Sequence, residues 1–570
     1  MARKPARKAS KKPARKPAKK ASKKPAAKPA KQPARKPAKK ASKKPAAKPA
    51  KQPARKPAKK ASKKPAAKPA KQPARKPAKK ATQKAAPKPS AKPATPAKPI
   101  PPKPASQPPM NEAAAARELI AEGPKPDHAM VAAARSALSV TPPQKLGDYQ
   151  RDAASVQGEG NLGRFDVIIV GGGPGGSTLA ALLRKQGRTV CVVERQAFPR
   201  FRIGESLLPF SMDIWKKSGV LPKIHEQGYL VKRGARFVLD ETLEEECFWF
   251  KNGLDKDHPY AFQVQRGPFD KLLLDHAREL GAEVFQPCSA TGWRITPDKA
   301  VLITDRGEIE GDVICDVTGR WTFMSARQNQ RRVHPQHRKI TCFAHFNNVV
   351  RCEQDPNNII IARFGEPKKG WFWLIPFADG TTSVGVVADA EYYRDSGKTP
   401  HDFFWESVRA SRSMAPRMEN AKACCDVLLE SDFSFISDRH VGDRWIKVGD
   451  SGVFVDPVFS SGVFLSTKAA DLAAGALEQA FARRDFSEAA FAGYEKLIRQ
   501  GTGVFWAFID AFYNRDFLKQ MVTSNRRPLL QSSITSLLAG DIFNENNALI
   551  PYLTGKEGTL ADPEVQALLG

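Results

Sequence analysis

The stretch Phe165–Pro209, FDVIIVGGGPGGSTLAALLRKQGRTVCVVERQAFPRFRIGESLLP, decides the fold. An apolar run at Val167–Val170 leads into a glycine-rich turn, a helical stretch and a second apolar run at Val190–Val193. The glycines at G-x-G-x-x-G spacing are Gly171, Gly173 and Gly176. This order predicts a Rossmann-like α/β unit, because such glycines allow a tight turn and a close approach of the backbone to a pyrophosphate.

Glu194 ends the second apolar run. An acidic residue at the end of this strand is expected to accept hydrogen bonds from a ribose diol, and the helix that follows the glycines offers its N-terminus to phosphate. The motif therefore predicts a dinucleotide site. By itself the motif does not tell whether FAD or NAD occupies the site.

The charge of the chain is concentrated in its first 110 residues. This tail contains 39 lysines and arginines and no acidic residue, whereas the remainder has 55 basic and 58 acidic residues. The formal net charge of +36 therefore describes the tail and not the body.

The unit ASKKPAAKPAKQPARKPAKK occurs three times without change, at Ala21–Lys40, Ala41–Lys60 and Ala61–Lys80. Because it has no large apolar residue and many prolines, we expect residues 1–110 to be disordered, followed by a linker with short helices at 111–160. The tail resembles those of linker histones and bacterial histone-like proteins, which implies binding to DNA or another polyanion. A solvating linker without a partner is the alternative.

Other sequence signals point to a cytoplasmic protein, associated with the nucleoid if the tail binds DNA. No apolar run is long enough for a transmembrane segment, and no apolar region follows the basic N-terminus. The eight cysteines lack C-x-x-C spacing. His334 and His337 have no further ligand nearby in the sequence, so we expect no metal site.

The end of the opening stretch contains two arginines and the sequence Gly204-Glu205-Ser206. It resembles the G-E-[AS]-x-x-P segment, the strap, that lies over the flavin in flavin-dependent halogenases. The resemblance implies that Arg202, Gly204 and Glu205 contact the cofactor. An ordinary basic loop is the alternative.

Lys232 lies in GYLVKRGARFVLD, a pattern that predicts a strand. Taken alone, such a lysine is usually an exposed residue of a strand edge. Halogenases have an essential lysine shortly before a basic–aromatic pair at this place, and here Arg236-Phe237 follows. The resemblance implies that Lys232 is catalytic and binds hypohalous acid or reacts with it to give a haloamine.

The run Trp371-Phe372-Trp373-Leu374-Ile375-Pro376 matches the W-x-W-x-I-P fingerprint of the halogenases. In that family the motif is held to obstruct monooxygenation by keeping the substrate away from the flavin. Core packing is the other interpretation of Trp371, Trp373, Ile375 and Pro376, because aromatic residues favour strands.

Two further segments complete the resemblance. Gly449-Asp450 resembles the segment that binds the ribityl chain of FAD, and Ser461-Gly462 resembles the pair whose backbone amides contact halide. Tryptophan halogenases place a glutamate just before that pair, whereas this chain has Phe459 and Ser460. The departure resembles the branch that acts on phenols, pyrroles or carrier-protein-bound substrates.

These patterns predict an α/β fold with a glutathione-reductase-type FAD domain, a sheet-rich substrate insert and a helical C-terminal cap. The expected bounds are 161–465 for the domain, about 210–390 for its insert and 466–570 for the cap. The resemblance implies a halogenase that uses FAD reduced by a separate flavin reductase, oxygen and halide to form hypohalous acid for an electron-rich aromatic substrate. The alternatives are a flavin monooxygenase or geranylgeranyl-reductase-like oxidoreductase, and a DNA-associated protein with a degenerate flavin fold.

Overall fold

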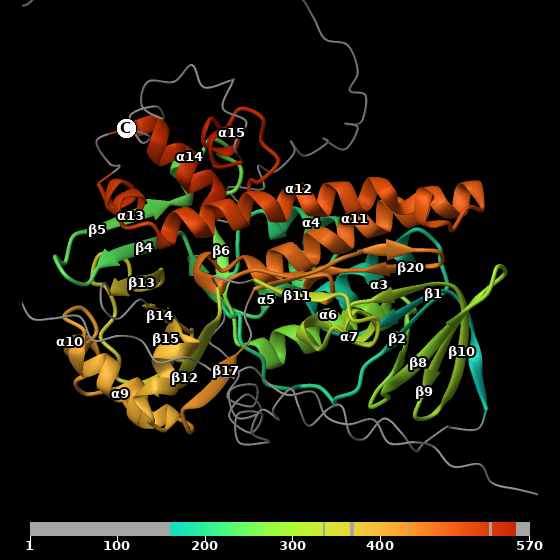
Figure 1. Cartoon of the computed structure of the whole chain (residues 1–570), viewed down its shortest axis with the longest axis horizontal. Helices are drawn as coiled ribbons and strands as arrows, with labels where there is room; N and C mark the ends of the chain where they lie inside the picture. The colour runs from blue at the N-terminus through green and yellow to red at the C-terminus, as the bar shows by residue number, and fades with distance from the viewer. Residues whose placement is uncertain (1–159, 335–336, 365–369, 432–433, 524–526, 555–570) are drawn as a thin grey trace, which may run out of the picture. The chain divides into compact units, whose positions relative to one another are not determined.

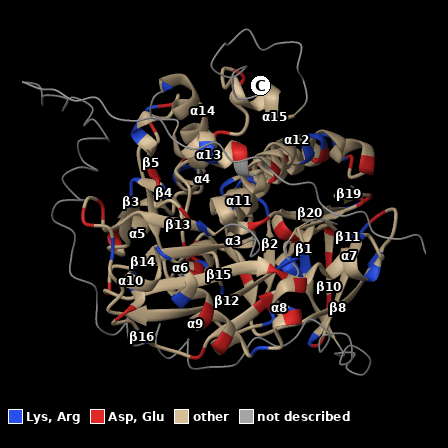
Figure 2. Ribbon diagram, turned by 60° about the vertical axis from the view of Figure 1, so that its left-hand side comes forward, with Lys and Arg blue, Asp and Glu red and all other residues tan. Residues whose placement is uncertain are grey.

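The computed structural model describes residues 160–334, 337–364, 370–431, 434–523 and 527–554 (Figure 1). All of them belong to the second of two units of the chain, Lys103–Gly570. The predicted basic tail lies outside the described residues, as does nearly all of the expected linker. Over the described part, basic and acidic residues are interspersed along the ribbon (Figure 2).

An eight-stranded sheet carries the glycine motif, and its centre is parallel. In order across it are β19 (Val441–Gly442), β20 (Trp445–Lys447), β10 (Gly307–Asp316), β1 (Asn161–Val170), β2 (Val190–Val193) and β7 (Glu283–Phe285). In addition, β9 (Ala300–Thr304) pairs with β10, and β8 (Ala290–Ile295) pairs with β9. Ile168 stands opposite Cys191 and Ile314. All three are fully buried, which explains the continuous apolar runs of these strands.

Four helices pack beside this sheet. α3 (Pro174–Lys185) contacts both α6 (Arg266–Glu279) and α11 (Ser461–Arg483), and α11 runs beside α12 (Glu488–Tyr513) (Figure 1). The helical C-terminal region was predicted from residue 466 onward, and its first helix, α11, begins slightly earlier, at Ser461. The first turn of α11 contains the predicted halide pair.

A second eight-stranded sheet carries the tryptophan motif. In order across it are β16 (Lys422–Ala423), β12 (Lys339–Asn347), β15 (Thr382–Asp389), β14 (Gly370–Pro376), β13 (Ile359–Phe364), β4 (Gly234–Leu239) and β5 (Glu245–Trp249), with β17 (Leu428–Ser431) paired to β12. Along β14, Trp371 and Trp373 face the main core, whereas Phe372 and Leu374 face a second core under α9 (Pro400–Ala410). Both faces of this strand are therefore buried.

The segment around Lys232 corrects one prediction. The single expected strand is split at Arg233 into β3 (Leu230–Lys232), which pairs with β6 (Ala261–Gln263), and β4 of the second sheet. The break lets the two halves join different sheets.

The remaining strands form a small sheet of β11 (Arg331–Val333), β18 (Phe435–Ser437) and β21 (Val453–Phe454). The other helices are α4 (Ser211–Ser218), α5 (Leu221–Glu226), α7 (Phe323–Arg327), α8 (Ala390–Ser396), α10 (Ala415–Met418), α13 (Arg515–Val522), α14 (Pro528–Ala539) and α15 (Leu549–Leu553). Within the described ranges, no helix combines the length and the apolar character that crossing a membrane requires.

Candidate active site

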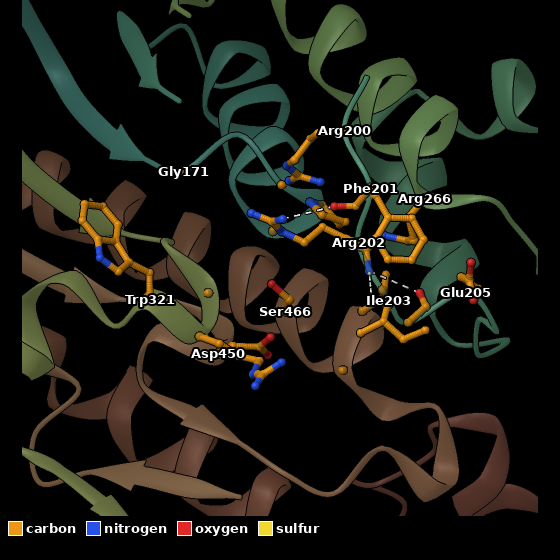
Figure 3. Close-up of a pocket in the computed structure, with 18 of the residues that line it drawn as sticks. Gly171, Arg200, Phe201, Arg202, Ile203, Glu205, Arg266, Trp321, Asp450 and Ser466 are labelled. Carbon is orange, nitrogen blue, oxygen red and sulfur yellow. Dashed lines mark hydrogen bonds between the residues drawn. The ribbon is translucent and has the colours of Figure 1, made fainter. Parts of the chain in front are cut away.

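A cavity of about 960 Å³ lies where β1, β2 and β10 end. It is lined by most of the predicted site residues: Gly171, Gly173, Glu194, Arg202, Gly204, Glu205, Trp371, Trp373, Ile375, Asp450 and Gly462. The predicted residues that do not line it are Gly176, Lys232, Pro376, Gly449 and Ser461. The fold thus gathers segments that are distant in the sequence around one space (Figure 3).

The glycines are required by close backbone packing. Gly171 has φ +112°, and a Cβ there would lie 2.3 Å from the carbonyl oxygen of Val317. A Cβ on Gly176 would lie 1.9 Å from the carbonyl oxygen of Gly171, whereas one on Gly173 would meet only the end of Arg200 at 3.5 Å. Gly173 caps α3, whose first turn has no acidic residue, so the amides beside the cavity suit a pyrophosphate.

Glu194 is buried at the end of β2. Its Oε2 accepts a hydrogen bond from the amide of Gly172 and its Oε1 accepts one from the amide of Gln196, both at 2.9 Å. A carboxylate has further lone pairs, so it retains capacity for a ribose diol. The two amides fix its orientation at the rim of the cavity.

The strap is held by two buried charged residues that sequence reasoning missed. Arg266 donates to the carbonyl oxygen of Ile203 at 2.7 Å (Figure 3), and its guanidinium also pairs with Asp270 at 2.7 Å. Asp270 pairs with Arg200 as well, at 2.7 Å. Burial opposes ionisation of Asp270, but the two arginines hold its pKa below the usual value. The only sequence signal was the i, i+4 spacing of Arg266 and Asp270.

Arginines give the cavity a positive lining. Burial, followed by the neighbouring Arg200 and Arg195, lowers the pKa of Arg202 to about 10. Glu205 takes a different partner: its Oε1 lies 2.7 Å from Nε2 of His345 on β12, and both side chains are buried. The strap is therefore tied to the second sheet by Glu205 and to α6 by Arg266.

Asp450 lines the opposite wall (Figure 3). It follows Gly449, which has φ +66° and whose Cβ would lie 2.5 Å from Oγ of Ser466 on α11. Burial raises the pKa of Asp450 to about 7, although Arg320 and Arg266 act in the other direction. A ligand with hydroxyl donors would stabilise its charged form.

Trp371 and Trp373 line the cavity, and their indole N–H groups donate to residues that do not line it. Nε1 of Trp373 donates to Oγ of Ser383 at 3.0 Å, and Nε1 of Trp371 donates to Oη of Tyr513 at 3.0 Å. The Trp373 ring lies over Gly385, where a Cβ would approach it to 2.2 Å. Both rings are thereby fixed.

The loop before α11 contains no carboxylate next to Ser461. Phe459 is buried and its ring stacks on Phe508 of α12 with centroids 4.1 Å apart. Ser460 has φ +59°, and the helix begins at Ser461, whose buried Oγ has no hydrogen-bond partner among the described residues. Gly462 faces the cavity.

Lys232 is 1% exposed; it lies against the strap and does not line the cavity. Its Nζ donates to the carbonyl oxygen of Leu207 at 2.9 Å and lies 5.4 Å from the ring centre of Phe250. Burial lowers its pKa to about 7. An amine in this state can exchange a proton at neutral pH.

The family model "Tryptophan halogenase" matches residues 166–250 and 250–547 of the chain. The chain belongs to the tryptophan halogenase family. It is 31% identical over 406 residues to 1H-pyrrole-2-carbonyl-(peptidyl-carrier protein) chlorinase of Pseudomonas fluorescens, over 67% of this chain and 90% of that protein. It is 30% identical over 366 residues to tryptophan 2-halogenase of Chondromyces crocatus, over 62% of this chain and 69% of that protein.

Solved halogenase structures share the fold. Flavin-dependent brominase Bmp2 superposes with a TM-score of 0.62 at 27% identity, over 69% of this chain and 98% of that one. The myxobacterial chondrochloren halogenase CndH, a variant of FAD-dependent halogenases, superposes with a TM-score of 0.58 at 28% identity, over 71% of this chain and 92% of that one.

These matches confirm the predicted enzyme class, an FAD-dependent oxidoreductase of the halogenase family, and do not favour the alternatives. The cavity also fits FAD on its own terms. It offers the N-terminal turn of α3 beside Gly173 and arginines for the pyrophosphate, and the carboxylates of Glu194 and Asp450 for hydroxyl groups.

Proposed function

We propose that this halogenase acts on an electron-rich ring of the pyrrole type presented by a carrier protein. Two relatives support this substrate class by name. Besides the chlorinase, 1H-pyrrole-2-carbonyl-(peptidyl-carrier protein) brominase of Pseudoalteromonas luteoviolacea is 29% identical over 393 residues, which are 67% of this chain and 93% of that protein. A free phenol is the second substrate to test.

The observation that carries the proposal is the buried ring of Phe459 at the position of the glutamate of tryptophan halogenases. Because it stacks on Phe508 in the core, neither this residue nor Ser460 brings a carboxylate to a substrate. A pyrrole or phenol ring is more electron-rich than the benzene ring of an indole, and it depends less on a dedicated base.

When bound, reduced FAD supplies hypohalous acid from oxygen and halide. A separate flavin reductase provides the reduced flavin, because the sequence has no second G-x-G-x-x-G motif for a nicotinamide. The backbone amides at the start of α11, around Ser461 and Gly462, hold the halide, since a helix N-terminus favours an anion.

Lys232 then transfers protons to the hypohalous acid and from the aromatic ring. In the overall step an aromatic C–H and hypohalous acid give an aromatic C–halogen bond and water. The ammonium of Lys232 donates a proton to the departing hydroxide, and the resulting amine accepts the ring proton, so the lysine ends as it began. Its complete burial and its pKa of about 7 support this double role.

The test is an assay with reduced FAD, oxygen, bromide or chloride and a pyrrole-2-carbonyl thioester on a carrier protein, read by mass spectrometry. We expect halogenated product from the wild type and none from Lys232→Ala, while flavin remains bound. Lys223→Ala is the matched control, because Lys223 is a surface lysine of α5 that pairs with Glu279. Hydroxylated product, or halogenation unchanged in Lys232→Ala, would contradict the proposal.

We also propose that the basic tail binds DNA or another polyanion, which would bring the enzyme to the nucleoid. The support is its 39 basic residues without an acidic one. A gel-shift assay over a salt series should show binding that weakens steeply with salt. If deletion of residues 1–110 leaves binding unchanged, the tail has another role.

A further inference from the structure

One face of α12 meets the chain at His334 and His337. Trp506, Asp510 and Tyr513 follow each other at intervals of four and three residues, so they share this face. The Trp506 ring lies against His334 with centroids 4.6 Å apart, and the Tyr513 ring lies 5.3 Å from that of His337. Asp510 lies between Trp506 and Tyr513 in the sequence, and its Oδ1 is 2.5 Å from Nε2 of His337.

His334, His337 and Asp510 form a compact cluster of side chains that can each bind a metal ion. One ligand atom from each of His334, His337 and Asp510 lies within 4.8 Å of the others. The two imidazoles stack with centroids 4.5 Å apart at 24°. Imidazole nitrogens are common ligands of transition metal ions.

The environment leaves capacity for a ligand. The side chain of His337 is 8% exposed, and its Nδ1 has no hydrogen-bond partner among the described residues. The Asp510 side chain is 52% exposed, so an ion and its water can reach the cluster from solvent.

We propose that His334, His337 and Asp510 bind a divalent transition metal ion, with Zn²⁺ as the expected occupant. Two imidazole nitrogens and one carboxylate oxygen suit Zn²⁺, and water would complete four-coordination. The sequence-based expectation of no metal site considered only nearby residues, whereas Asp510 is 173 positions from His337.

The ion would join the segment after β11 to α12 and take no part in the halogenation chemistry. It lies beside Tyr513, whose hydroxyl donates to Asp456 of the loop before α11 at 2.8 Å. Binding would therefore stiffen the helix face that reaches the active-site loop. The proposal does not depend on the choice of aromatic substrate.

The experiment uses the full-length, FAD-loaded protein after removal of metals with a chelator. We titrate Co²⁺, follow its visible absorption, and compete it with Zn²⁺. We expect one equivalent to bind, no binding in His337→Ala, and affinity at least about tenfold lower in Asp510→Asn, since even outer-shell changes cost about that much. Asp510→Glu should retain binding.

The matched controls are His401→Ala and Asp402→Asn, which alter an exposed His–Asp contact of 3.3 Å on α9 and should leave the titration unchanged. Flavin content and circular dichroism establish that each variant is folded. The proposal is overturned if the wild type binds no Co²⁺, if His337→Ala binds it equally, or if a sulfur-to-cobalt charge-transfer band assigns the ion to Cys424 or Cys425.

Discussion

Nε1 of Trp371 donates a hydrogen bond to Oη of Tyr513 at 3.0 Å, and that hydroxyl in turn donates to Oδ2 of Asp456 at 2.8 Å. Asp456 is fully buried and also accepts from the amide of Val458 at 3.1 Å. The end of α12 therefore joins the tryptophan strand to the loop that precedes the halide pair.

Replacing Tyr513 with Phe should loosen this junction. The change leaves one buried oxygen of Asp456 without its donor, so we expect a loss of about 1–3 kcal/mol in the free energy of unfolding. Because the loop leads into the first turn of α11, whose amides are proposed to hold the halide, the KM for bromide should rise more than kcat falls. Tyr392→Phe, on α8, is the control. A KM unchanged from wild type would show that the junction is only structural.

Substitution of Lys232 should show a distinctive pH dependence of stability. Burial lowers the pKa of Lys232 to about 7, below the ordinary value of 10.5. Between these values the unfolded state binds more protons than the folded state, so the wild type gains stability as pH rises from 7 to 10.5.

The variant Lys232→Met has no such titration. Below pH 7 it should be more stable than the wild type, and its advantage should shrink as the pH rises toward 10. Urea unfolding of both proteins at several pH values measures the difference. A constant difference would mean that Lys232 titrates equally in the folded and unfolded states.

Replacing Phe459 with glutamate should not produce an enzyme that halogenates free tryptophan. In Phe459→Glu a carboxylate replaces a ring that stacks on Phe508 in the core, so we expect a loss of about 3 kcal/mol or more. Phe459→Leu keeps the site apolar and should lose less. Thermal unfolding ranks the variants, and halogenated free tryptophan from a stable Phe459→Glu protein would refute the expectation.

Asp270→Asn should weaken both the fold and the flavin site. It leaves the buried Arg266 and the partly buried Arg200 without their shared counter-charge, and such a change costs about 3–5 kcal/mol. Since Arg266 holds the strap, FAD affinity measured by fluorescence quenching should fall as well. Asp275→Asn, on the same helix in a surface pair with Lys271, should cost less than about 1 kcal/mol. Equal effects would argue against a special role of Asp270.

Gly176→Ala should abolish FAD binding, because the added Cβ would lie 1.9 Å from the carbonyl oxygen of Gly171 and force the turn apart. Gly475→Ala is the control on α11, where a Cβ meets nothing within 4 Å and alanine favours the helix. Flavin content after purification measures the outcome. Retained flavin in Gly176→Ala would show that the turn can relax.

Local patterns in the chain were enough for the nucleotide turn, for β1 and β2 of the first sheet, and for the helical C-terminal region. The glycine spacing reflects backbone contacts within Gly171–Gly176, and buried parallel strands give continuous apolar runs whatever their partners. The tryptophan motif lies on a strand, as aromatic residues favour, although β14 pairs antiparallel with both of its neighbours. It did not indicate which residues its indoles would bond.

Other features arise only when distant segments pack together. The split at Arg233, the bond from Arg266 to Ile203 in the strap, and the contact of Trp371 with Tyr513 join residues whose spacing in sequence carries no periodic signal. The same holds for the pairing of His337 with Asp510. A hydrogen bond or ion pair depends on a few ångströms between side chains, and that distance is set by how the sheets and α12 pack against one another.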